Sequence, residues 1–174
     1  MSYSLSQAAV PVFEINLTAL SGVLDKALAF QAAKKLDPAV LPQSRLAPDM
    51  FALTRQVQVA CDQAKNGASR LVGVEPPKYE DNEKTLEDLK ARVAKTIAYV
   101  KSLDKAKIDA AADREITFPL GPVNKGAMKG DDYLTHFVLP NFYFHCTAAY
   151  AILRHCGVEI GKQDYLGAIP MKMT

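Results

Sequence analysis

The three histidines of this 174-residue chain are the residues best suited to acid–base or metal chemistry near neutral pH, and they are His136, His145 and His155. On one regular helix, His145 would point about 180° away from His136 around the helix axis, and His155 would be rotated by about 280° from His145. A zinc-type site needs its ligands about 2 Å from one point, so these three cannot share an ion from one helix. The spacings H-x-x-x-H, H-E-x-x-H and E-x-x-H are also absent. The sequence therefore predicts no metal site, and no motif in it indicates a cofactor.

His145 is the strongest single candidate for a functional residue. Asn141 precedes it by four residues, and Ala148 and Ala149 follow it by three and four. On a helix these residues form one stripe with polar groups at one end and small side chains beside them, which leaves room for a ligand or water. There, His145 would act as a base or hydrogen-bond donor. The alternative is a structural core histidine, bonded to a carbonyl group that Pro140 leaves without a donor.

A second polar line consists of Asp49, Gln56 and Gln63, each seven residues from the next. If this line faces His145, an Asp–His or Gln–His pair could bind a small-molecule ligand or a metal ion. The alternative is that these are ordinary surface residues, with Asp49 near the start of a helix. We therefore predict a pocket formed by Asp49, Gln56, Asn141 and His145, and we assign no catalytic residue.

Four segments with helical periodicity must position these side chains. Each has apolar residues at steps of three and four, and each is bounded by capping or breaking residues. The first opens with the capping-box spacing Ser4 to Gln7 and contains Pro11, at which the helix either begins or is kinked. The second is expected to begin near Pro48 and to stop at Asn66-Gly67. The predicted helical segments are 4–37, 48–66, 82–103 and 131–156.

Two segments depart from a simple amphipathic helix. Residues 114–130 look extended and then turn, which predicts a short hairpin-like excursion. The last helical segment is apolar nearly all round, so it is either central in the bundle or buried by a partner subunit. The charged residues of segment 82–103 are expected to form a solvated face. Together these patterns predict an all-α four-helix bundle with an excursion before the last helix.

The composition is that of one globular domain spanning 1–174. The chain is 49% hydrophobic and 23% charged, with a net charge of +2, so clustered basic residues for a nucleic-acid partner are not expected. We find no run of about 18 apolar residues and no signal peptide, and expect no membrane partner. Cys61, Cys146 and Cys156 form no C-x-x-C pair, which favours reduced thiols and a cytoplasmic location.

Several long motifs resemble one known family. Segments 46–51 and 55–58 are similar to the second helix of the bacterial DUF1993 proteins, and segments 139–145, 149–155 and 161–167 to their C-terminal part. These proteins resemble the DinB/YfiT-like superfamily of four-helix bundles. The resemblance covers essentially the whole chain. It implies a helical bundle, frequent dimerisation and descent from metalloenzymes, some of them thiol-dependent transferases or isomerases.

The resemblance also implies a metal site made by one histidine of the second helix and an H-x-x-x-H pair on the last. This chain has no histidine in 48–66, and Ala149 stands four residues after His145, so at most one of three ligands is present. The first hypothesis is therefore a degenerate metal site with a small molecule bound in the bundle interior. The alternatives are a non-catalytic homodimeric module, associating through bundle helices, and a metal-dependent (thiol) transferase or hydrolase. Whether the protein is an enzyme stays open at this point.

Overall fold

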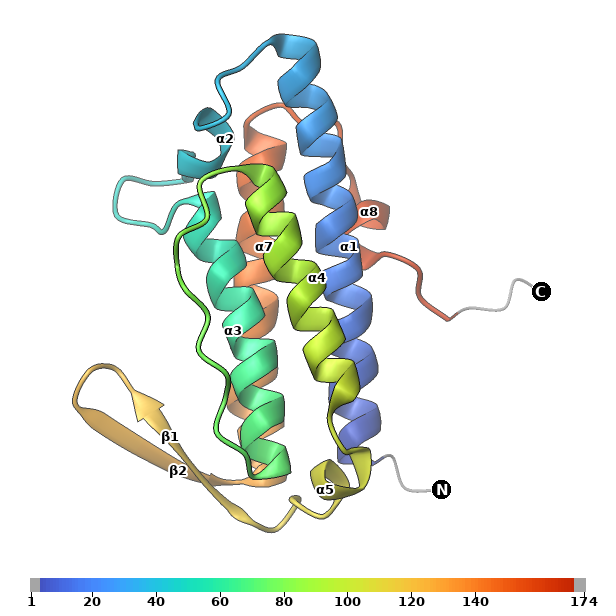
Figure 1. Ribbon diagram of the computed structural model, residues 1–174, viewed down its shortest axis with the longest axis vertical. Coiled ribbons are helices and arrows are strands. Elements are labelled where there is room, and N and C mark those ends of the chain that lie inside the picture. Colours follow the sequence, from blue (N-terminus) through green and yellow to red (C-terminus); the bar gives the residue numbers. More distant parts are fainter. Residues whose placement is uncertain (1–3, 171–174) are drawn as a thin grey trace.

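Four long helices form the body of the computed structural model, which describes residues 4–170 (Figure 1). They are α1 (Leu5–Lys34), α3 (Leu53–Val72), α4 (Leu86–Ser102) and α7 (Leu139–His155). The main interfaces join α1 to α4, α4 to α3 and α3 to α7, and α7 also meets α1, which closes the bundle. Their apolar sides meet in one core. The predicted four-helix bundle is confirmed.

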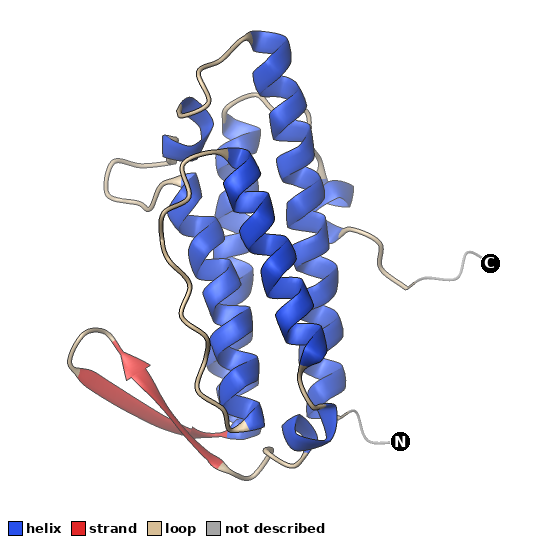
Figure 2. Cartoon of the chain, in the orientation of Figure 1, coloured by secondary structure: helices blue, strands red, loops and turns tan. Residues whose placement is uncertain are grey.

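Most of the shorter elements lie at the ends of the bundle, whereas the short helix α8 (Lys162–Leu166) packs against the side of α1 (Figure 2). Strands β1 (Glu115–Leu120) and β2 (Asn124–Lys129) form an antiparallel hairpin beside the start of α7, with Glu115 opposite Lys129 and Leu120 opposite Asn124. This is the predicted excursion. The remaining elements are α2 (Val40–Gln43), α5 (Lys105–Asp109), α6 (Gly130–Asp132), a π-helix (Tyr133–Val138) and α8 (Lys162–Leu166).

The start of α1 follows the local sequence. The Ser4 hydroxyl accepts a hydrogen bond from the Gln7 backbone N–H, and the Gln7 side chain accepts one from the Ser4 N–H, which is the predicted capping box. The helix therefore begins at Leu5, and the alternative of a start at Pro11 is wrong. By length and composition α1 would also pass as a membrane-spanning helix, which the sequence analysis did not find. Its apolar side chains, such as Phe13 and Leu17, lie in the bundle core.

Helix α3 differs from its predicted bounds at both ends. It begins at Leu53 rather than near Pro48, and it ends at Gly73, whose left-handed backbone (φ 86°) suits glycine. Gly67, the predicted stop, lies inside the helix, and Val138 packs directly against it. A Cβ atom at this glycine would lie 2.5 Å from Cγ1 of Val138. The glycine thus permits close packing of α3 against the π-helix that precedes α7.

The last helical segment is interrupted where Pro140 predicts it. Six residues, Tyr133–Val138, form a π-helix just before α7, and Pro140 lies in the first turn of α7. Helix α7 is not central: it occupies one corner of the bundle like the other three. Its inner side is buried, whereas Tyr143 and Phe144 on its outer side are 37% and 57% exposed.

Candidate functional site

The side chains of His145 on α7 and Gln56 on α3 meet directly between the two helices. His145 is 8% exposed and Gln56 1% exposed, and Nδ1 of the imidazole lies 2.7 Å from Oε1 of the amide. The Gln56 amide nitrogen donates to the backbone carbonyl of Phe51 at 3.3 Å. Because a carbonyl oxygen can only accept, this contact turns the amide oxygen toward His145. His145 therefore carries its proton on Nδ1 and donates it to Gln56, which leaves the lone pair on Nε2.

Two aromatic rings flank the imidazole. The Phe51 ring is stacked on His145, with centroids 6.4 Å apart and an interplanar angle of 20°, and the Phe144 ring meets it edge-on at 5.1 Å and 89°. Both phenylalanines are about half exposed, at 52% and 57%. A buried polar ring thus lies just beneath two exposed apolar rings, an arrangement that presents both a hydrogen-bonding atom and flat apolar surface.

The surroundings favour the neutral imidazole. Burial lowers the pKa of His145 from its ordinary value of 6.5, and the positive charge of Arg55 lowers it further. The Arg55 guanidinium lies 6.0 Å from the centre of the Phe51 ring, which is itself stacked on His145. A neutral histidine with a free Nε2 lone pair can accept a hydrogen bond or a proton.

The structure brings together two of the four predicted pocket residues. Asp49 is exposed and lies in the loop before α3, outside the helix whose first turn it was expected to join. Asn141 is half-buried, and its amide donates to the carbonyl of Phe137 one turn earlier at 2.7 Å. His145 is buried, as the core-histidine alternative expects, but the partner expected there, a carbonyl freed by the proline, is wrong, since His145 is bonded to Gln56.

The donors around His145 do not fit a zinc-type site. The nearest side chain on α3 is an amide already bonded to Nδ1, and Ala149, one turn further on α7, offers a methyl group. Of the other histidines, His136 is 69% exposed beside Asp132, and His155 is exposed at the end of α7. Within residues 4–170, no group of three His, Cys, Asp or Glu side chains is arranged to hold a metal ion. We therefore derive no metal-dependent transferase or hydrolase step.

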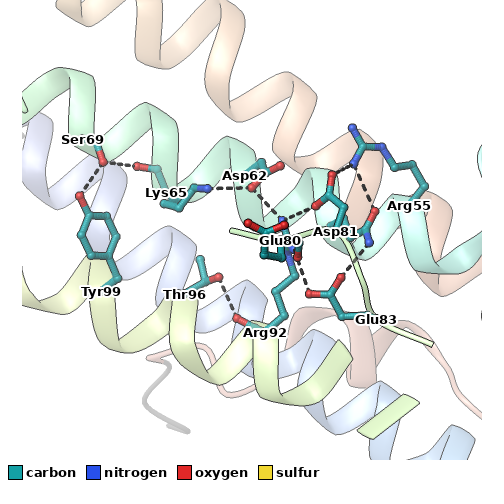
Figure 3. Close-up of polar contacts among 11 residues, drawn as sticks. Arg55, Asp62, Lys65, Ser69, Glu80, Asp81, Glu83, Arg92, Thr96 and Tyr99 are labelled. Carbon is teal, nitrogen blue, oxygen red and sulfur yellow. Dashed lines mark hydrogen bonds and ion pairs between the residues drawn. The ribbon is translucent and has the colours of Figure 1, made fainter. Parts of the chain in front are cut away.

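A second polar cluster, which the sequence analysis missed, surrounds Arg92 of α4 (Figure 3). Its side chain is 2% exposed and forms ion pairs with Asp62 of α3 at 3.0 Å, Asp81 at 3.1 Å and Glu83 at 2.9 Å. The last two belong to residues 74–85, the connection between α3 and α4, which we call the strap. A cation with three carboxylate partners in this position ties the strap to the bundle.

The expectation that the charged residues of α4 all face solvent is wrong at Arg92. The residue lies three positions after Leu89 and directly before Val93, and both of these are fully buried. Thr96, four positions later, is buried too, and its hydroxyl donates to the Arg92 carbonyl. The helical spacing therefore placed Arg92 on the buried stripe, and this signal was available in the sequence.

Comparisons with known proteins agree with the bundle. A DinB family member protein from Shewanella denitrificans, solved by crystallography, is 44% identical to this chain; the match covers 98% of this chain and 96% of that one, with a TM-score of 0.89. No curated protein matches the chain. The family model DUF1993, described as a domain of unknown function, matches residues 5–166. On this evidence the chain belongs to the DUF1993 family and is a DinB-like helical bundle.

Proposed function

We propose that this protein binds a small molecule beside His145, at a degenerate form of the metal site that the DinB-like resemblance implies. The observation that supports this is the Gln56–His145 hydrogen bond of 2.7 Å, which holds the ring in one tautomer with Nε2 unprotonated. In a metal-binding relative this nitrogen would be a ligand. In this chain it is an acceptor for an O–H or N–H group of a bound molecule.

The aromatic neighbours define the chemical class of the molecule. Phe51 and Phe144 each expose about half of their surface, 52% and 57%, next to the imidazole. Flat apolar surface of this kind favours a planar, largely apolar molecule with one hydrogen-bond donor directed at Nε2 of His145. If the molecule is a substrate, the neutral His145 would accept its proton as a general base.

The proposal is tested with two matched probes, phenol and anisole. Phenol carries the O–H donor and anisole replaces it with a methyl ether. The Hε1 resonance of His145 is followed by NMR, with the exposed His136 and His155 as internal references. We expect phenol, at up to about 10 mM, to shift the His145 resonance and anisole to shift it much less, because only phenol can donate a hydrogen bond to Nε2. A dissociation constant of about 1 mM, which corresponds to about 4 kcal/mol, is measurable at this concentration. Equal shifts with both probes, or none with either, would contradict the proposal.

A second candidate function, a non-catalytic homodimer, is favoured by the outer side of α7. Tyr143 and Phe144 are exposed there at 37% and 57%, and exposed aromatic residues are enriched in protein interfaces. Sedimentation velocity of the wild type and of Phe144→Glu tests the homodimer. A dimer that the substitution dissociates supports the homodimer, whereas a wild-type monomer at about 100 μM excludes a dimer with a dissociation constant near 1 μM.

A further inference from the structure

The strap, residues 74–85, is held to the bundle mainly by its side chains. Within the described chain, residues 75–84 make no backbone–backbone hydrogen bond. Asp81 and Glu83 pair with Arg92, and they also bind Arg55 and Gln58 of α3 respectively. The ring of Tyr79 and the Glu80 carbonyl, which accepts a hydrogen bond from Arg92 at 3.0 Å, complete the attachment. In Figure 1 the strap is the green segment that runs along α3 to the start of α4. A segment without backbone pairing can leave the surface without breaking any helix or sheet.

The groove beneath the strap, between α3 and α4, carries an excess of buried positive charge. The side chains of Lys65 and Arg92 are 5% and 2% exposed, and both pair with the same carboxylate, Asp62, at 3.0 Å. The balancing negative charge comes from the strap, through Asp81 and Glu83. A buried charge without a partner is costly, so the helices alone define a groove that requires an anionic occupant.

The aromatic ring of the strap occupies a cationic position in this groove. The ammonium groups of Lys65 and Lys95 lie 4.1 Å from the centre of the Tyr79 ring, on α3 and α4 respectively. This is cation–π distance, and a half-buried ring between two lysines gains from both. Cys61 is fully buried on α3, one helical turn before Lys65, so it lies on the face of α3 that the Tyr79 ring covers.

The strap leaves open space on its α4 side. A pocket of about 470 Å³ lies beside Tyr79, lined by strap residues such as Lys78 and by the α4 residues Ala91, Arg92 and Lys95, and not by α3. Within the described residues, Nε of Arg92 is buried and has no hydrogen-bond partner. An unpaired buried donor beside unfilled space indicates capacity for a further acceptor group.

We propose that the strap is a displaceable lid, and that the α3–α4 groove binds in its place an acidic peptide segment carrying an aromatic side chain. The carboxylates of that peptide would pair with Arg92, and its ring would lie between Lys65 and Lys95. The strap is the intramolecular occupant of the same site. Because it is tethered at both ends, its effective concentration is high, and a separate peptide gains access when the strap is weakened.

The opening of the lid is measured through the reactivity of buried thiols. Two single-cysteine variants are compared, one keeping Cys61 beneath the strap and one keeping Cys146, which is buried on α7. Each is studied with and without the strap substitutions Asp81→Asn and Glu83→Gln. We expect these substitutions to speed the labelling of Cys61 by a thiol reagent by about tenfold or more and to leave Cys146 unchanged, because local opening exposes one thiol alone. Equal acceleration of both thiols, or of neither, would overturn the lid.

Recognition of a peptide is measured in the variant that keeps only Cys61 and carries Asp81→Asn and Glu83→Gln. A synthetic peptide of residues 74–85 is added at about 1 mM, the range of effective concentration of a short tether. We expect it to slow the labelling of Cys61 several-fold. A control peptide with Tyr79→Ala and its acidic residues changed to amides should give no protection. If the acidic peptide protects no better than the control, the groove does not recognise this class of segment and the proposal is wrong.

Discussion

The imidazole Nδ1–H of His145 donates a hydrogen bond to the side-chain oxygen of Gln56 across 2.7 Å, linking two helices whose residues are 89 positions apart in the sequence. Both side chains are buried, and the amide nitrogen of Gln56 is held by the Phe51 carbonyl. One contact therefore decides the tautomer of the histidine and leaves Nε2 as its free acceptor.

Replacing Gln56 with leucine is expected to destabilise the protein. Leucine is similar in size to glutamine but has no acceptor, so the buried Nδ1–H of His145 would be left unpaired. This costs about 1–3 kcal/mol in the free energy of unfolding. Urea unfolding followed by circular dichroism measures the change. Gln63→Leu, one heptad along the same helix and half-buried, is the control and should change stability by less than about 0.5 kcal/mol. Equal losses in the two variants would show that the hydrogen bond contributes nothing.

The depressed pKa of His145 predicts a pH dependence of stability. Burial and Arg55 lower this pKa below 6.5, so at pH values between the folded and unfolded pKa the unfolded chain binds more protons than the folded one. The free energy of unfolding should therefore fall as the pH decreases below about 6.5, and His145 should contribute no slope above that value. Urea unfolding between about pH 5 and pH 7.5 should show this slope in the wild type and in His155→Gln, but not in His145→Gln. A slope that persists without His145 would assign the effect to another group.

Arg92→Met should be strongly destabilising. The change removes a cation that is 2% exposed and leaves Asp62, Asp81 and Glu83 without their shared partner. Breaking a buried ion pair from one side costs about 3–5 kcal/mol, measured as a shift in the urea midpoint at constant m-value. The exposed pair Lys101–Glu14, 2.7 Å long, provides the comparison: Lys101→Met should cost less than about 1 kcal/mol. Similar losses in both variants would mean that burial of Arg92 is energetically unimportant.

Two glycines in helices predict opposite responses to alanine. At Gly67 a Cβ atom would lie 2.5 Å from Val138, so Gly67→Ala should cost about 1–3 kcal/mol through overpacking. At Gly22 nothing lies within 4 Å and the position is exposed, so Gly22→Ala should stabilise α1 by about 0.5–1 kcal/mol. Thermal unfolding of the two variants measures the signs. The added change Val138→Ala should recover part of the loss at Gly67, and a failure to do so would contradict the packing explanation.

Local patterns in the sequence were sufficient for the helical part of the fold. The apolar steps of three and four in segments such as 82–103 predict one buried side per helix, and four such sides can be buried together only in a bundle. The Ser4–Gln7 capping box and the extended pattern in 114–130 were also readable, because each depends on residues that are neighbours along the chain. The same logic failed at Gly67. This glycine does not stop the helix but makes room for the side chain of Val138, which is 71 positions away in the sequence.

The sequence by itself determined the bundle, and it nominated Gln56 and His145 as residues on two different helices. The tertiary structure decided which polar groups meet: it paired these two, left Asp49 in a loop and bonded Asn141 to the preceding π-helix. Periodicity places a residue on a face but does not choose the partner opposite it. That choice depends on the rotation and axial register of two packed helices, which are set by close contacts such as Val138 on Gly67.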